Sequence, residues 1–281
     1  VGMASCLLIA LWVWDELGYN AFHEKADGIY LVVSERVGHR GEFYAETPVP
    51  LAEVLRSDYP EIAKAARFNF RDNVIGRRGE KVFTDWRGAY VDPEVFEVFT
   101  FPLSKGDPRT ALDKPSAVVL TETAARNLFG EADPLGQMLE VEEGDLVEVT
   151  GVLRDIPALS DIQVHYVRPW RAMKELVQYR NFIWNWFSCS TYVLLQDGAE
   201  AAGVQAKISG LLNANRPWVK DQLDVSLFPL ADMHLRRPGG GGPIKYVYVF
   251  GAVAIMILLI ACINFMNLST ARSAKRAREV G

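Results

Sequence analysis

The residue types best suited to binding a metal are few and scattered in this chain. Zinc sites use closely spaced pairs such as Cys-x-x-Cys or His-x-x-His. No such pair occurs among the three cysteines and four histidines, which are Cys6, Cys189, Cys262, His23, His39, His165 and His234. We therefore expect these histidines to be structural or exposed residues rather than metal ligands.

Other stretches that resemble ligand-binding or catalytic motifs lack essential parts. The acidic stretch 140–145 has no spaced ligand set of a calcium loop, and Gly144 favours a hairpin turn there. Glycines 239–242 are not followed by the Lys-Ser or Lys-Thr pair of a phosphate-binding loop. No Gly-x-Ser-x-Gly sequence occurs, and Ser188 and Ser190 have no base close by in sequence. The sequence therefore favours a binding or mechanical role, with no enzymatic activity and no cofactor.

An aromatic cluster stands out in the last third of the chain. Its members are Trp170, Tyr179, Trp184, Trp186 and Phe187. Such rings can line a ligand groove, but core packing or a protein contact surface is the commoner use.

Charged residues are absent from residues 1–14 and 246–271 but abundant between them. Residues 15–245 carry 26 basic and 34 acidic side chains, a net charge of −8. This acidic balance argues against a nucleic-acid partner. The tail from Arg272 to Gly281 has four basic residues and one acidic residue, a net charge of +3.

The second uncharged segment is long enough to cross a membrane, because about 20 apolar helical residues span a bilayer core of about 30 Å. A buried helix in a large soluble core is the alternative. Residues 1–14 would cover only about 21 Å, so we expect the sequence to begin inside a first membrane helix. The basic tail favours a cytoplasmic end. Cys189 is the one cysteine of the middle part, so no disulfide is expected within it.

Between the apolar segments, short strands and helices alternate irregularly, which predicts an α+β domain. Strands are expected at Ile29–Ser34, Ala117–Leu120, Leu146–Arg154, Thr191–Leu195 and Val225–Pro229, and helices at Pro50–Tyr59, after Asp92, after Thr121 and over Gly198–Leu212. Asp92 and Thr121 are expected to cap their helices, and Gly130 to end one in the left-handed conformation. Residues 72–186 are expected to form a second subdomain inserted into the first. Residues 238–243, rich in Gly and Pro, predict a flexible joint.

Several stretches, taken in order, resemble one known family. Tyr19–Tyr30 resembles the segment that leaves the first membrane helix in MacB-type periplasmic core domains. Further similar pieces are Phe96–Phe101-Pro-Leu, Gly106-Asp-Pro, Ala111-Leu, Val118–Glu122, Phe129-Gly, Asp133–Gly136, Val149–Leu153, Asp155-Ile-Pro157 and Phe228–Leu235. The most specific match is Leu259–Gly281, which closely resembles the start of an FtsX-like permease domain.

This resemblance implies a permease subunit of an ATP-binding-cassette (ABC) transporter. Such a subunit has four membrane helices and carries an extracytoplasmic α+β domain between the first two. Carried over to this chain, residues 1–17 end the first membrane helix and residues 18–237 form the domain. A porter-like subdomain (18–71 and 187–237) then holds an inserted subdomain (72–186). The joint is residues 238–245, the second membrane helix 246–268, and the start of the cytoplasmic coupling segment 269–281.

The resemblance also implies partners and a location. ATP would be bound by a separate or fused ATPase, and the permease would work as a homodimer or heterodimer. The chain would lie in the bacterial inner membrane with its large domain in the periplasm, where an adaptor protein is a further expected partner. The substrate that is exported or released stays open.

Coupling to the ATPase is expected at the end of the chain. The residues concerned are Arg272, Lys275, Arg276, Arg278 and Glu279, which would meet an acidic ATPase surface or anionic lipid. Simple anchoring of a positive tail is the alternative. Asn264 and Asn267, three residues apart, are expected to contact a neighbouring membrane helix.

The rival function is a receptor. A sensor kinase or a chemoreceptor also places a folded domain between two membrane helices and signals through a helix after the second one. A membrane-tethered hydrolase is the least favoured class.

Overall fold

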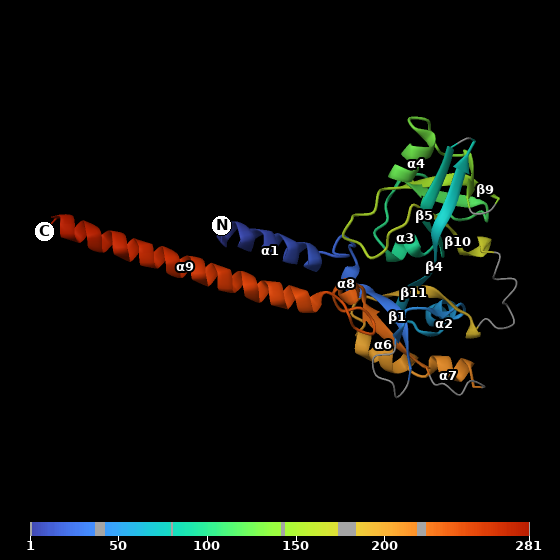
Figure 1. Ribbon diagram of the computed structural model, residues 1–281. Coiled ribbons are helices and arrows are strands. Elements are labelled where there is room, and N and C mark those ends of the chain that lie inside the picture. Colours follow the sequence, from blue (N-terminus) through green and yellow to red (C-terminus); the bar gives the residue numbers. More distant parts are fainter. Residues whose placement is uncertain are drawn as a thin grey trace. The chain divides into compact units, whose positions relative to one another are not determined.

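The computed structural model describes residues 2–36, 43–79, 81–141, 144–173, 184–217 and 223–280. The chain forms two compact units (Figure 1). The helical unit contains residues 1–19, 234–237 and 241–281, and the mixed unit contains residues 20–233 and 238–240. The chain therefore passes from one unit to the other at Tyr19–Asn20 and again at Met233–His234, and residues 238–240 return briefly to the mixed unit.

The mixed unit is built on a four-stranded antiparallel sheet with the order β12–β1–β11–β4. Its strands are β1 (Ile29–Arg36), β4 (Ile62–Arg78), β11 (Phe187–Leu195) and β12 (Leu223–Pro229), and the short strands β2 (Phe43–Tyr44) and β3 (Thr47–Pro48) pair with β1 and β11. Helix α2 (Leu51–Asp58) connects β1 to β4, and helices α6 (Ala201–Ile208) and α7 (Leu211–Asn215) connect β11 to β12. This order of strands and helices is ferredoxin-like.

The chain between β4 and β11 forms a second strand assembly. Its strands are β5 (Lys81–Val91), β6 (Leu103–Lys105), β7 (Ala117–Thr121), β8 (Met138–Val141), β9 (Asp145–Leu153) and β10 (Tyr166–Pro169), with helices α3 (Val95–Val98) and α4 (Glu122–Phe129). Pairing runs β4–β5–β10–β7–β9–β8 and returns to β4, so these six strands close into a ring. Closure removes the open edges that would otherwise pair with other chains.

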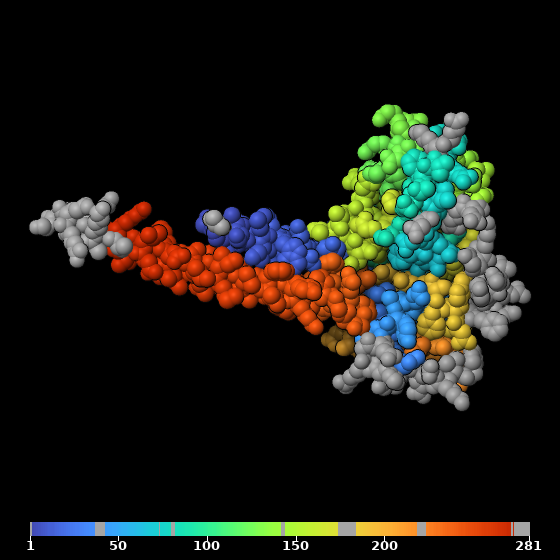
Figure 2. All heavy atoms as spheres, in the orientation of Figure 1, coloured from blue at the N-terminus to red at the C-terminus, as the bar shows by residue number. Residues whose placement is uncertain are grey.

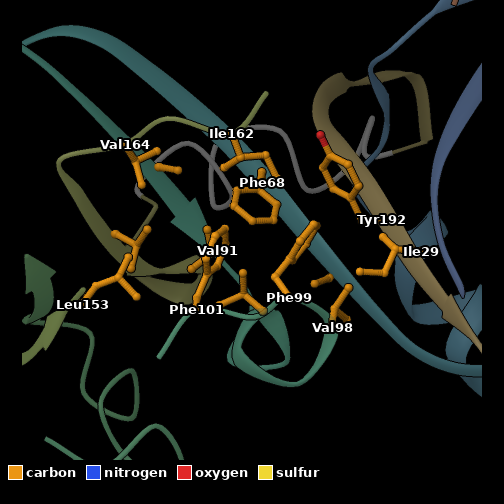
Figure 3. Packing of buried hydrophobic residues seen from close by; sticks show 14 of the residues in the cluster. Ile29, Phe68, Val91, Val98, Phe99, Phe101, Leu153, Ile162, Val164 and Tyr192 are labelled. Atoms are coloured by element: carbon orange, nitrogen blue, oxygen red, sulfur yellow. The ribbon is translucent and has the colours of Figure 1, made fainter. Parts of the chain in front are cut away.

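The largest buried cluster joins the two assemblies (Figure 3). Phe68 on β4 contacts Tyr192 on β11 and Phe99, with ring centroids 5.5 and 5.6 Å apart and the rings nearly perpendicular. Val91 and Leu153, from strands of the ring, belong to the same cluster. Burying a large apolar side chain stabilises a fold by about 1.5–3 kcal/mol, so this shared core holds the mixed unit together as one body.

Several local expectations are confirmed. The expected strands correspond to β1, β7, β9, β11 and β12, and Pro50–Tyr59 contains α2. The Thr121 hydroxyl accepts a hydrogen bond from the Ala124 N–H at 3.3 Å and so caps α4. Gly144 joins β8 to β9 with φ of 89°, as the hairpin requires. Gly130 ends α4 with φ of 64°, but its ψ of −127° lies outside the left-handed helical region.

Two helix predictions were wrong. Residues 198–212 do not form one helix, because the chain breaks between α6 and α7 at Gly210, which has φ of 77° and donates its N–H to Asp224. Asp92 does not cap a helix with its side chain, because that carboxylate binds Arg67 through two hydrogen bonds of 2.7 Å. Helix α3 instead begins after Glu94 and has only four residues.

The predicted aromatic cluster is divided between two packing regions. Trp170, at the start of the short 3-10 helix η2 (Trp170–Ala172), is buried beneath the Arg67 guanidinium, 4.4 Å from its ring centroid. Trp186 packs with it, whereas Trp184 and Phe187 pack against the cluster under α2 and α6. Tyr179 lies outside the described residues. The described members therefore pack against the core, as the commoner of the two interpretations expected.

The outer edge of β12 is covered by side chains from the helices beside it. Gln205 on α6 donates its amide to the Val225 carbonyl at 2.5 Å and accepts from the Leu227 N–H at 2.6 Å. The Asn213 amide oxygen accepts from the Leu223 N–H at 3.1 Å, and Pro229 has no N–H to offer. Side chains thus take the place of a neighbouring strand on this edge.

Replacing Gln205 by Ala should lower the free energy of unfolding by about 1–3 kcal/mol, because two partly buried backbone groups lose their partners. Urea unfolding of the purified chain measures this. The control is Gln196→Ala, whose exposed side chain has no such role and should change stability by less than about 0.5 kcal/mol. Equal effects of the two substitutions would contradict the role of Gln205.

Candidate functional site in the helix pair

The helical unit contains one long apolar helix. Helix α9 (Ile244–Val280) runs for 37 residues without a break. Its segment Ile244–Thr270 is, within the part of the chain that the structure describes, the one helix long and apolar enough to cross a membrane, and only 6% of its most apolar stretch is buried. An unburied apolar surface of this size marks a contact with lipid or with another protein.

Helix α1 (Gly2–Leu17) packs along the first half of α9 (Figures 1 and 2). The Cys6 thiol donates to the Ala254 carbonyl at 3.3 Å, and the Trp12 and Phe250 rings meet edge to face at 5.2 Å. At the other end, a side chain at Gly2 would touch Ala261 at 3.6 Å. Small residues at these contacts allow two helices to approach closely.

A polar contact closes this helix pair at the end from which the chain leaves. Glu16 on α1 and His234 on the short helix α8 (Met233–Arg236) are joined by a contact of 2.8 Å between Oε2 and Nε2. The Tyr19 ring stacks on the His234 ring at a centroid distance of 3.3 Å. Both side chains of the pair are mostly buried, with 17% and 13% exposed. We call Glu16, Tyr19 and His234 the helix clamp.

A second set of contacts lies at the same two places of the chain, but inside the mixed unit. The Asn20 side chain donates to Asp161 Oδ2 at 2.7 Å and to the Leu230 carbonyl at 3.1 Å, and it accepts from the Asp161 N–H at 3.0 Å. Asn20 is 1% exposed and has a positive φ of 60°. Leu230 begins the 3-10 helix η4 (Leu230–Asp232) that leads into α8. We call Asn20, Asp161 and Leu230 the domain clamp.

The sequence-predicted site residues all lie in α9. Asn264 and Asn267 are exposed, three residues apart on one side of the helix. Arg272 is also exposed. Lys275, Arg276, Arg278 and Glu279 lie in the helical backbone up to Val280, and their side chains are outside the described residues.

Sequence reasoning missed both clamps. Glu16 and His234 are 218 residues apart, and Asn20 and Leu230 are 210 residues apart. His234 was expected only to be structural or exposed, and no local pattern pointed to its partner. The positive φ of Asn20 is a feature that asparagine tolerates better than most residues, but it is visible only in the structure.

A comparison with protein families decides the identity of the chain. The profile of the MacB-like periplasmic core domain matches residues 1–211. The chain belongs to this family. Membership makes it a component of the ABC-transporter permease family, a membrane protein with an extracytoplasmic domain, and supports the permease interpretation over the receptor.

Solved structures share the fold of this MacB-like chain. A domain of a candidate permease protein from Porphyromonas gingivalis has a TM-score of 0.62 at 20% identity, covering 74% of this chain and 92% of that one. The periplasmic region of MacB from Actinobacillus actinomycetemcomitans has a TM-score of 0.53 at 19% identity, covering 74% and 91%. The extracellular domain of the ABC-type transporter YknZ from Gram-positive bacteria has 0.52 at 15%, covering 70% and 99%. No curated protein matches the sequence.

Removing the Glu16 carboxylate should loosen α8 from α1. We expect Glu16→Ala to lower the free energy of unfolding of the helical unit by about 1 kcal/mol, because His234 loses a mostly buried charged partner. Thermal unfolding of the detergent-solubilised chain measures the change. Asp15→Ala is the matched control, since Asp15 is the exposed neighbour of Glu16. The clamp is refuted if both variants unfold alike.

Proposed function

We propose that this chain is the part of an ABC-transporter permease subunit that carries the motion of a cytoplasmic ATPase to an extracytoplasmic domain, for export or release of a substrate. One observation carries the proposal beyond the family match. The unburied apolar helix α9 follows the domain directly in the chain and continues unbroken into a basic segment.

In this proposal both helices lie in the membrane, and aromatic residues mark one water–lipid boundary. Trp12 contacts Phe250, and Trp14, Tyr246 and Tyr248 are exposed near the same end of the helix pair. Tryptophan and tyrosine favour this boundary because their rings are apolar and their polar groups reach water. From Phe250, the 20 residues to Thr270 cover about 30 Å, the thickness of a bilayer core.

An uninterrupted helix is suited to transmitting force. Helix α9 continues past Thr270 to Val280, so a push on its far end would move its near end with little bending. We propose that Arg272, Lys275, Arg276, Arg278 and Glu279 form the ATPase contact. Four of these five residues are basic, which suits contact with an acidic surface.

We propose that the mixed unit acts as two subdomains, with residues 72–186 inserted between residues 18–71 and 187–237. This division supports the idea that motion entering through the ferredoxin-like sheet reaches the inserted strands through β4, which pairs in both assemblies. The remaining parts of the proposal are residues 1–17 and 246–268 as membrane helices, 238–245 as a joint and 269–281 as the coupling segment. The site of action would be the bacterial inner membrane, with an adaptor in the periplasm as a further partner.

Reversing charge at the coupling segment should weaken the ATPase contact. We expect Lys275→Glu with Arg276→Glu to lower both co-purification of the ATPase subunit and stimulation of its activity at least ten-fold, because two attractive charges become repulsive. Lys245→Glu, at the opposite end of α9, is the matched control and should leave both readouts unchanged. Unchanged association of the double variant would reject the assigned contact.

The exposed amides of α9 should hold a further membrane helix, from this protein or from a second permease. An amide that faces lipid lacks hydrogen-bond partners, so it favours association by about 0.6–2 kcal/mol. We expect Asn264→Leu with Asn267→Leu to lower the fraction of dimer, measured by single-molecule photobleaching in lipid vesicles. Met266→Leu, at a neighbouring position without an amide, is the control for this double substitution. A dimer fraction that survives the double substitution would rule these amides out as the contact.

A further inference from the structure

The segment that follows Tyr19 is fastened to the turn after α3 by contacts around one histidine. We call residues 20–25 the linking segment. The Thr100 N–H donates to His23 Nδ1 at 3.1 Å, and the Glu24 N–H donates to the Thr100 hydroxyl at 2.8 Å. Lys25 adds a third bond, from its ammonium to the Glu97 carbonyl at 3.1 Å. The histidine ring is therefore one of several ties between two parts of the domain about 75 residues apart in sequence.

The His23 ring is enclosed by aromatic side chains. It is 3% exposed, and its centroid lies 3.9 Å from that of Phe22, 5.2 Å from that of Phe99 and 5.4 Å from that of Phe101. Because Nδ1 accepts a hydrogen bond, the neutral ring must carry its proton on Nε2. Nε2 is buried and has no hydrogen-bond partner among the described residues. Phe99 and Phe101 are themselves part of the core cluster shown in Figure 3.

This surrounding strongly favours a neutral imidazole over a charged one. A protonated ring would carry a second N–H, on Nδ1, pointing at the N–H of Thr100, so an attractive contact would become repulsive. The positive charge would also be buried, with no acceptor for Nε2 among the described residues, which makes it costly. Protonation of the ring therefore strongly disfavours the closed position of the linking segment.

We propose that His23 is a proton-released latch, which holds the linking segment against the Phe99–Phe101 turn while the ring is neutral and frees it when the ring takes up a proton.

Several charged groups lie near the linking segment and the residues packed against it. They are Glu24, Lys25 and Asp27 on the side of the linking segment, Glu97 on α3, Arg154, Asp155 and Asp161 on the stretch after β9, and Asp232 on η4. Burial, rather than any of these charges, lowers the pKa of His23 from its ordinary 6.5 to about 4. The ring therefore resists protonation while the segment is closed, and acid acts by favouring the open segment.

The sign and range of the response follow from these two values. The open segment binds a proton below about pH 6.5 and the closed one only below about pH 4, so acid favours opening between these limits. The opening equilibrium should rise about ten-fold per pH unit in this range and about 300-fold in total, and then level off. Above pH 6.5 the latch should be insensitive to pH.

Hydrogen exchange of the full chain in lipid nanodiscs tests the proposal. Rates for amides 22–24 and Thr100, corrected for the intrinsic pH dependence of exchange, report the opening equilibrium. The intact chain should show the rise between pH 6.5 and 4. His23→Asn can keep an acceptor near Nδ1 but cannot titrate, so its corrected rates should be flat. His165→Asn, which changes an exposed histidine elsewhere, should keep the rise.

Each alternative outcome overturns the latch. Flat rates in the intact chain would show that opening is not linked to a proton, and a rise that persists in His23→Asn would assign it to another group. If His23→Asn fails to fold, nuclear magnetic resonance of the intact chain decides, because a His23 ring that titrates near 6.5 is not enclosed. These readouts need no ATPase, so their failure would leave the proposed coupling function standing.

Discussion

The first two covalent passages between the units, Tyr19–Asn20 and Met233–His234, are the constraint on which any mechanical role of this chain depends. On the helical side, Glu16 and Tyr19 bind His234, and on the domain side Asn20 binds the carbonyl of Leu230. Within each unit, the two ends that lead to the other unit are therefore held together. A movement of α8 relative to α1 would have to break a mostly buried contact before the two passages could separate, so the clamps favour movement of the two passages together.

Beyond the passages, strand pairing and core packing link the two strand assemblies of the mixed unit. Strand β4 pairs with β11 in one assembly and with β5 and β8 in the other. The Phe68 ring on β4 contacts the rings of Tyr192 and Phe99. Packed cores transmit displacement because they contain few voids that could absorb it. The closed ring of strands has no free edge there, and Gln205 covers the edge at β12. These features leave few unpaired strand edges in the described part of the domain.

Local patterns predicted the elements of this fold better than its long-range contacts. Alternation predicted β9 and a capping threonine predicted the start of α4, because these depend on residues close in sequence. The break at Gly210 was missed because its cause is Asp224, 14 residues away on a strand. Asp92 was assigned to a cap because nothing nearby reveals Arg67, 25 residues before it. The two clamps depend on pairs more than 200 residues apart, which no single-sequence pattern can join.

Composition predicted a flexible joint at the glycines before α9, but the backbone geometry gives a different reason for glycine at these positions. Gly239, Gly240 and Gly241 all have positive φ between 84° and 87°, a conformation that side chains disfavour. A Cβ at Gly242 would overlap the carbonyl of Leu235 on α8. Glycine at these positions is therefore required by a tight turn between α8 and α9, whatever freedom it also has. The second passage then leads from the domain clamp through α8 and a tight turn into α9, whereas the first runs through the linking segment and its latch. If His23 releases that segment, acid would loosen the chain between the first passage and β1, whereas the domain clamp would still hold Asn20 at the passage itself.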